Sequence, residues 1–240
     1  MYVAIRRLIH PYVILLTRFR VHYHITLQNE VSFASKRPVI YAVNHTNSRD
    51  IPLACRAAGK HCVVLIGKQP LYFSDRLFFW LNGAIWVDRK NKQDMNRAKE
   101  DIIRVVKKKQ SVIWFPEGTW NQSDNLLMLP MKWGIIDVAQ KAGAIIVPVV
   151  LDYENENDRC TALVGNTINP DEYSLADGIN YLRDSMASLR WSLWETKGRF
   201  SRAEIDIDKE RQSFRQDIED YPPLDWEYEQ SIIFHPYPIV

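Results

Sequence analysis

The chain is poor in cysteine, in net charge and in long apolar runs. Its three cysteines, Cys55, Cys62 and Cys160, form no C-x-x-C pair, so we expect the reduced, buried thiols of a cytosolic protein rather than a disulfide framework. The formal net charge of +2 is too small to indicate a nucleic-acid partner. The apolar stretch at residues 8–16 is far shorter than the roughly 20 apolar residues that span a bilayer as a helix.

The remaining composition is that of an ordinary globular protein, with 46% hydrophobic and 25% charged residues among 240, and it allows a sizeable core. Short apolar runs alternate with helical patterns. This alternation predicts an α/β fold: a mostly parallel mixed sheet flanked by helices, with an N-terminal interfacial helix and a helical C-terminal tail. We expect three segments: an amphipathic membrane-interface segment at residues 1–30, the α/β domain at 31–195, and a peripheral tail at 196–240.

The N-terminal segment has an apolar centre between Arg6, Arg7, Arg18 and Arg20. This pattern favours a helix that lies in a membrane interface, with its arginines reaching the headgroups. The alternative is a helix that packs on the domain and keeps its basic ends in water. Residues 25–31 are expected to add an edge strand.

The elements of the α/β domain follow from apolar periodicity. Strands are expected at residues 38–43, 62–66, 84–87, 111–115, 144–151 and 160–164, and helices at 51–58, 71–81, 94–109, 131–142 and 179–194. Large apolar residues at 73, 77, 80 and 81 predict a buried face on the second of these helices. Pro148 predicts an edge position or a bulge for the strand that contains it.

The segment N-H-T-N-S-R-D at residues 44–50 joins a strand to a helix, and ligands of open α/β sheets bind at such carboxyl ends of strands. A turn can bring the Asp50 carboxylate to the His45 imidazole and orient the ring as a general base. No serine nucleophile is evident, which suits a substrate that brings its own hydroxyl. The alternative is an ordinary loop histidine beside a helix-capping aspartate. Asn47 or Ser48 can also cap this helix.

Four motifs in order resemble the 1-acylglycerol-3-phosphate acyltransferase (lysophosphatidic acid acyltransferase) family of the glycerolipid acyltransferase superfamily. N-H-T-N-S-R-D at 44–50 matches N-H-x-x-x-x-D, and G-A-I-W-V-D-R at 83–89 matches G-x-x-x-x-x-R. F-P-E-G-T at 115–119 matches the third motif, and I-V-P-V at 146–149 matches the apolar block with a proline. K-W-G at 132–134 is similar to the K-x-G of the family.

The resemblance covers residues 39–151 and implies transfer of a fatty acyl group from a thioester to a lysophospholipid hydroxyl. It makes His45 the general base and Asp50 the residue that orients it. It assigns the acceptor's phosphate to Arg89, whose fork suits phosphate oxygens. It also places Glu117 and Gly118 at the acceptor pocket, where backbone N–H groups can serve a developing oxyanion.

The residues expected to bind substrate are therefore Asn44, Arg89, Glu117, Gly118, Thr119 and Lys132. The resemblance implies 1-acylglycerol-3-phosphate as the acceptor, acyl-CoA or acyl-carrier protein as the co-substrate, and a role in phospholipid biosynthesis. No cofactor and no metal are expected, since the six histidines are scattered. The expected location is peripheral, on the cytoplasmic face of a membrane.

One residue departs from the family pattern: Trp120 follows F-P-E-G-T where the family usually has arginine. A different lysolipid or a glycolipid acceptor is therefore an alternative, because an indole can stack on a sugar ring or cover an acyl chain. Further alternatives are a thioesterase or lipase, which a missing G-x-S-x-G elbow disfavours, a non-enzymatic membrane lipid-binding module, and a metal hydrolase with His45 and Asp50 as ligands.

Overall fold

The computed structural model describes residues 3–29, 37–69, 71–121, 123, 127–154, 157–212, 227–229 and 231. Most of the predicted C-terminal tail lies outside the described residues, as does the end of the predicted edge strand at residues 30–31. The fold and the candidate site are built from the described residues.

One seven-stranded sheet runs through the molecule in the order β1-β7-β6-β2-β5-β3-β4. The strands are β1 (His24–Gln28), β2 (Val39–Val43), β3 (Cys62–Gly67), β4 (Ala84–Val87), β5 (Ser111–Trp114), β6 (Ile145–Glu154) and β7 (Arg159–Val164). Neighbouring strands are parallel except for β6 and β7. The predicted α/β fold with a mostly parallel mixed sheet is therefore confirmed, as is an edge strand in the N-terminal region.

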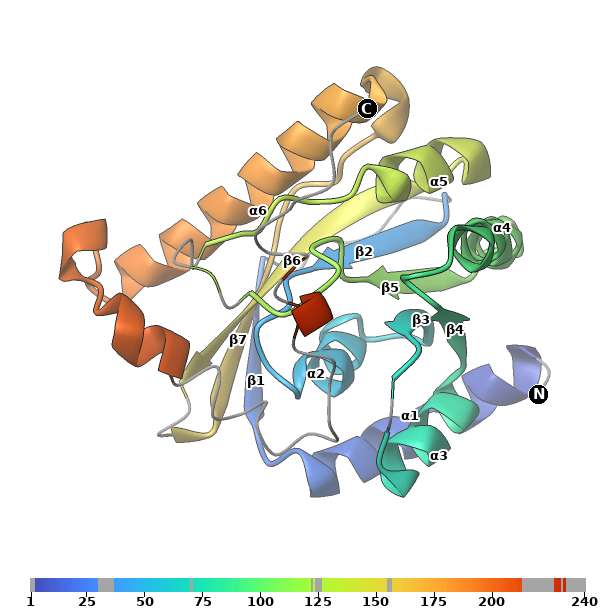
Figure 1. The fold of residues 1–240 in the computed structure, drawn as a ribbon. Helices are drawn as coiled ribbons and strands as arrows, with labels where there is room; N and C mark the ends of the chain where they lie inside the picture. The colour runs from blue at the N-terminus through green and yellow to red at the C-terminus, as the bar shows by residue number, and fades with distance from the viewer. Residues whose placement is uncertain are drawn as a thin grey trace.

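Helices cover both faces of this sheet (Figure 1). On one face lie α1 (Val3–Arg20), α2 (Asp50–Ala57) and α3 (Phe73–Asn82); on the other lie α4 (Lys92–Lys107), α5 (Gly134–Ala142) and α6 (Leu175–Thr196). Short 3₁₀ turns, η2 (Pro170–Glu172) and η3 (Arg202–Glu204), follow β7 and α6.

The central strand β2 shows why its sequence reads as one apolar run. Ile40 and Ala42 pack into the core on the side of α4, α5 and α6, whereas Val39, Tyr41 and Val43 pack into the core on the opposite side. A strand covered on both faces needs apolar side chains in both directions. The same enclosure explains the cysteines: Cys55, Cys62 and Cys160 are all buried and free, as predicted.

The predicted buried face of the helix at residues 71–81 is wrong. Phe73 and Trp80 are 81% and 63% exposed, and Leu77 is also exposed, while the buried apolar residue of this helix is Phe79. Periodicity finds the apolar stripe of a helix but not its partner. In the structure α3 contacts α1, and part of its apolar stripe faces outward.

The edge position suggested by Pro148 is also wrong, because β6 lies inside the sheet between β2 and β7. Pro148 pairs with Ala42 of β2. On its other side the β7 ladder has already ended at Val164, and Gly165 donates its N–H to the Pro148 carbonyl at 2.9 Å. The proline therefore sits where the neighbouring chain leaves the ladder, so its missing N–H does not interrupt that ladder.

The N-terminal helix is confirmed as α1. It packs inward through Val13 and Thr17, and it exposes Leu8, Tyr12 and Phe19. Among the described residues, no helix is long and apolar enough to cross a bilayer.

Candidate active site

The motif residues meet because four parallel strands end at one edge of the sheet. β2, β5, β3 and β4 are consecutive neighbours and run in the same direction. The turns that follow them carry residues 44–50, 115–119, 67–69 and 88–89, respectively. Segments that lie far apart in the sequence thus come together at the carboxyl ends of the strands.

The turn after β2 brings His45 and Asp50 into direct contact. The His45 Nδ1 atom lies 2.8 Å from the Asp50 Oδ2 atom, and the same oxygen accepts the backbone N–H groups of Thr46 and Asn47 at 2.7 and 2.9 Å. An oxygen that accepts two backbone N–H groups is an acceptor toward the ring as well. In the neutral His45 ring the proton therefore lies on Nδ1, and the Nε2 lone pair is the one that can accept a proton.

The second carboxylate oxygen of Asp50 has a partner that sequence reasoning missed. The Tyr153 hydroxyl, from the end of β6, donates to Asp50 Oδ1. Asp50 is fully buried. Hydrogen bonds to both of its carboxylate oxygens hold the side chain in one orientation. Tyr153 lies 103 residues away from Asp50 and no motif marks it, so no local signal could have identified it.

The start of α2 differs from the expectation. Arg49 occupies the N-cap position without a side-chain cap, so the predicted caps at Asn47 and Ser48 are wrong. The Asn47 side chain instead accepts the Arg49 N–H at 2.9 Å within the turn. Asp50 is the first residue of α2, and its carboxylate turns back to the loop N–H groups.

The His45 ring packs against two aromatic rings. Its centroid lies 4.5 Å from that of Phe115 and 5.0 Å from that of Trp120. The His45 side chain keeps 16% of its surface exposed and lines the cavity described below. Trp120, the residue that departs from the family pattern, therefore packs on the candidate base itself.

Two predicted binding residues, Asn44 and Glu117, are buried in the framework behind His45. The Asn44 amide exchanges two hydrogen bonds with the backbone of Leu151, at 3.0 and 2.7 Å. Glu117 accepts the backbone N–H groups of His45 and Leu129 at 2.9 and 2.8 Å. Burial raises the pKa of Glu117 to about 7, against the lowering effect of these two N–H groups.

Arg89 leaves β4 and reaches the turn after β5. Its Nη1 donates to the Gly118 carbonyl at 2.6 Å. A Cβ atom on Gly67 would lie 3.0 Å from the Arg89 Nε atom, so the glycine allows the guanidinium its close approach to β3. Gly118 has a φ of +76°, a conformation that favours glycine, and its own N–H closes the turn by donating to the Phe115 carbonyl at 3.1 Å.

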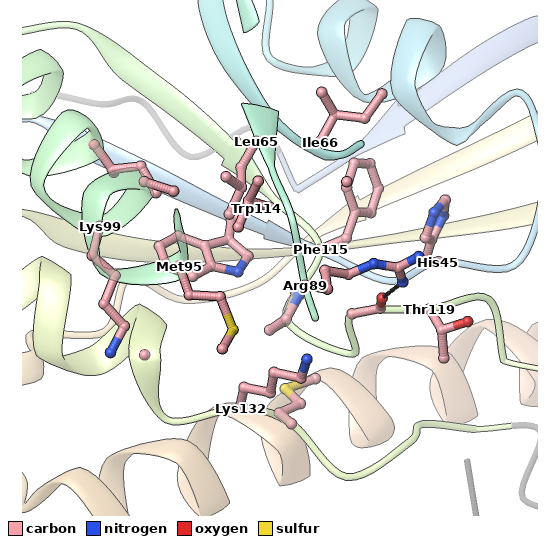
Figure 2. Close-up of a pocket in the computed structure, with 18 of the residues that line it drawn as sticks. His45, Leu65, Ile66, Arg89, Met95, Lys99, Trp114, Phe115, Thr119 and Lys132 are labelled. Carbon is pink, nitrogen blue, oxygen red and sulfur yellow. Dashed lines mark hydrogen bonds between the residues drawn. The ribbon is translucent and has the colours of Figure 1, made fainter. Parts of the chain in front are cut away.

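These groups border a cavity of about 400 Å³. In the close-up, His45, Arg89 and Thr119 lie toward one end, and Met95 and Lys99 of α4 lie toward the other (Figure 2). Leu65, Ile102 and Trp114 add apolar surface, and Lys132 adds an amine. The arrangement combines a base, cationic side chains and an apolar wall in one space.

The structure thus brings His45, Arg89, Gly118, Thr119 and Lys132 to the cavity wall. Asp50, Asn44 and Glu117 stand behind that wall. Sequence reasoning also missed Glu229, which lines the cavity from the C-terminal segment. That segment is weakly periodic and matches no motif, so the sequence carries no signal for it.

Comparisons with known proteins identify the family of this chain. The family model described as Acyltransferase matches residues 24–152. The 1-acyl-sn-glycerol-3-phosphate acyltransferase of Saccharomyces cerevisiae is 34% identical over 119 residues, which is 49% of this chain and 39% of the yeast protein. The Escherichia coli protein of the same name is 32% identical over 134 residues, 54% of this chain and 49% of its own length. The match therefore spans less than half the length of either relative.

A solved structure shares the fold. The crystal structure of the 1-acyl-sn-glycerophosphate (LPA) acyltransferase PlsC from Thermotoga maritima superposes with a TM-score of 0.62 at 16% identity, and the match covers 82% of this chain and 83% of that one. The family model spans more than half of the 240 residues and includes the His45–Asp50 turn, Arg89 and the F-P-E-G-T turn. This chain belongs to the Acyltransferase family, as its motifs predict.

Proposed function

We propose that the protein moves a fatty acyl group from an acyl thioester to the free hydroxyl of a lysophospholipid, with 1-acylglycerol-3-phosphate as the acceptor. The observation that carries the proposal is His45, paired with the buried Asp50, at the wall of a cavity that has both cationic and apolar lining. The names of the yeast and bacterial relatives support the choice of acceptor.

In the proposed reaction, the His45 Nε2 atom takes the proton of the acceptor hydroxyl while its oxygen attacks the thioester carbonyl. The Asp50 carboxylate holds the ring and stabilises the imidazolium that forms. The tetrahedral intermediate then collapses, the carbon–sulfur bond breaks, and the thiolate takes the proton back from His45. One ester and one free thiol result, and no acyl-enzyme forms.

The cavity supports this assignment of groups. Arg89 lies at the same end as His45 and supplies a fork for the acceptor's phosphate. The apolar wall formed by Leu65, Ile102 and Trp114 suits an acyl chain. Every atom that moves comes from the two substrates or from His45, so the reaction as written uses no cofactor. The donor is acyl-CoA or acyl-carrier protein, and the product serves phospholipid biosynthesis.

We also propose that the protein works as a peripheral protein on a membrane surface. α1 and α3 contact each other and expose large apolar side chains, among them Leu8, Phe19, Phe73 and Trp80. Exposed apolar side chains on a helix that also exposes arginines, here Arg7 and Arg18 of α1, are typical of helices that lie in the headgroup region. Lysolipid acceptors reside in the same region, so this face would bring the cavity to its substrate.

Trp120 supports one alternative acceptor. Its ring packs on His45 and is buried, where a second arginine would otherwise extend the cationic surface. A lysolipid or glycolipid with less negative charge therefore remains the second candidate. Both candidates use the same base and the same chemistry.

The test is transfer of a labelled acyl group by the full chain. Acyl-CoA and acyl-carrier protein are offered in parallel, with 1-acylglycerol-3-phosphate, other lysophospholipids and lysoglycolipids as acceptors, on vesicles that contain each acceptor. We expect ester formation with 1-acylglycerol-3-phosphate. Thiol release without any acceptor would instead indicate a thioesterase, and lipid binding without transfer would indicate a binding module. Transfer to another acceptor alone would favour the Trp120 alternative.

A further inference from the structure

The C-terminal segment of the described chain places a carboxylate on Arg89. The Glu229 carboxylate spans both terminal nitrogens of the guanidinium, with Nη1 at 3.0 Å from Oε2 and with Nη2 in contact with Oε1. The Thr119 hydroxyl donates to the same carboxylate. The preceding residue, Tyr228, lies with its ring centroid 5.2 Å from the Arg89 guanidinium and 4.7 Å from the Lys90 amine.

This contact is buried. Glu229 is 4% exposed, and the Arg89 side chain keeps 17% of its surface. Arg89 also donates to the Gly118 carbonyl. In this arrangement the guanidinium fork already holds an anion in a bidentate manner.

The cavity as a whole favours anions. Four basic side chains line it, Arg89, Lys92, Lys99 and Lys132, and Glu229 is the one acidic residue among the described lining residues. A carboxylate that presents two oxygens to an arginine fork takes the same donors that a phosphate takes. The two anions cannot share one fork, because their like charges would repel each other in a largely desolvated site.

We propose that Glu229 is a selectivity-determining residue that competes with the acceptor's phosphate for Arg89. The inference rests on the proposed function in that it takes a phosphate-bearing lysolipid as the acceptor. Such an acceptor displaces Glu229 from Arg89 before its hydroxyl reaches His45. An acceptor without a terminal phosphate leaves the Arg89–Glu229 pair in place.

A phosphate-bearing ligand binds only the molecules in which Glu229 has left Arg89. Its apparent affinity is therefore reduced in proportion to the fraction of such molecules. Removing the Glu229 charge removes the competitor but leaves the base untouched. The Michaelis constant for the phosphate-bearing acceptor therefore falls, while kcat is retained.

The test compares the full-length wild-type chain with Glu229→Gln, a nearly isosteric change that removes the charge. Glu227→Gln is the matched control, because Glu227 is an exposed carboxylate two residues earlier. Calorimetric titration with glycerol 3-phosphate measures binding of the headgroup alone and needs no catalysis. Transfer kinetics with 1-acylglycerol-3-phosphate and with uncharged 1-monoacylglycerol measure the effect on turnover, and thermal unfolding confirms that each variant is folded.

We expect Glu229→Gln to bind glycerol 3-phosphate about tenfold more tightly, with the same fold-change in KM for 1-acylglycerol-3-phosphate. Glu227→Gln should match the wild type, and kinetics with 1-monoacylglycerol should not change. Unchanged or weaker glycerol 3-phosphate binding in a folded Glu229→Gln protein would overturn the proposal.

A second variant keeps the test decisive if Glu229→Gln does not fold. Tyr228→Leu keeps both partners of the Arg89–Glu229 pair and removes the aromatic ring that packs on the Arg89 guanidinium. We expect glycerol 3-phosphate binding to tighten about two- to fivefold, and no tightening would count against the proposal.

The two proposals fail separately. Tighter glycerol 3-phosphate binding without any acyl transfer would support the Glu229 competition and overturn the acceptor assignment. Transfer to 1-acylglycerol-3-phosphate with equal binding and equal KM in the wild type and Glu229→Gln would uphold the proposed function and overturn the competition.

Discussion

His45 and Arg89 line one cavity, and each contacts a buried carboxylate, but the two carboxylates come from very different places in the chain. Asp50 lies five residues after His45, in the same turn. Glu229 lies 140 residues after Arg89. A partner fixed by a short turn is present whenever the turn is folded. A partner from a distant segment can be exchanged for a ligand without disturbing the sheet.

The contacts around each carboxylate fit this difference. Asp50 accepts from a ring nitrogen, two backbone N–H groups and the Tyr153 hydroxyl. Within the described part of the chain, the donors to the Glu229 carboxylate are side chains, those of Arg89 and Thr119. We call His45–Asp50 the local pair and Arg89–Glu229 the remote pair. We propose that the local pair orients the base and that the remote pair controls access of the ligand.

The largest effect is expected at the local pair. His45→Ala removes the base, and general-base catalysis is typically worth about 10²–10⁴-fold, so kcat for acyl transfer should fall by that factor in a protein that still folds. Acyl-transfer rates at saturating substrate, together with circular dichroism, measure this. Retention of full activity in folded His45→Ala would eliminate the proposed mechanism.

A smaller effect of a different kind is expected at the remote pair. Arg89→Ala removes the charged hydrogen-bond donor that we propose for the acceptor's phosphate. Such a bond is worth about 1.5–3 kcal/mol, so KM should rise by about 10–100-fold with little change in kcat. Arg104→Ala is the control, because Arg104 is an exposed arginine of α4 paired with Asp101. A fall in kcat at constant KM would show that Arg89 acts on the chemistry and not on the acceptor.

Tyr153→Phe should weaken the local pair without breaking it. The change removes one hydroxyl donor to the Asp50 carboxylate, and loss of a hydrogen bond to a charged group is worth about 1.5–3 kcal/mol when it is fully expressed. Because three other donors remain, we expect kcat to fall about tenfold or less. Tyr41→Phe, in a buried tyrosine of β2, is the control, and an equal fall in both variants would argue against a specific role for Tyr153.

Glu117 is a third buried carboxylate, and its hydrogen-bond donors are the backbone N–H groups of His45 and Leu129. Here the effect of burial on the pKa outweighs the effect of these donors. Burial raises its pKa from 4.5 to about 7. Because this pKa is higher in the folded chain than in the unfolded chain, the folded chain binds more protons between about pH 4.5 and 7. The contribution of Glu117 to stability is complete below this window and is lost as the pH rises through it.

The full loss amounts to about 3–4 kcal/mol, at about 1.4 kcal/mol for each pKa unit. Urea unfolding at pH 5 and pH 8 measures it, with Glu117→Gln as the comparison. We expect the difference in unfolding free energy between the two pH values to shrink in Glu117→Gln. An unchanged difference would show that Glu117 does not titrate in this range.

The sequence predicted most of the local pair and little of the remote one. The His45–Asp50 contact depends on one turn between a buried strand and a helix, and both elements have strong patterns. The strand order places Arg89 and Gly118 beside that turn, and the motifs indicated both residues. These features follow from short segments whose geometry the sequence constrains directly.

The features that escaped prediction depend on contacts between distant parts of the chain. Tyr153 reaches Asp50 only because β6 lies beside β2 in the interior of the sheet, where Pro148 had suggested an edge. Phe73 and Trp80 were expected to be buried, because periodicity does not say which side of an apolar helix the protein covers. Glu229 belongs to a segment without a motif, so its contact with Arg89 becomes visible only in three dimensions.

The most direct test of the central claim, that Asp50 acts through His45, is acyl transfer by Asp50→Asn, His45→Ala and the double variant. Asp50→Asn alone should lower kcat strongly, since the amide no longer holds the imidazole in the tautomer that leaves Nε2 free. In the double variant we expect the same residual rate as in His45→Ala alone, because a positioning residue has no effect once its base is gone. A double variant slower than His45→Ala by the full Asp50→Asn factor would contradict the account, since Asp50 would then act on the substrate independently of His45.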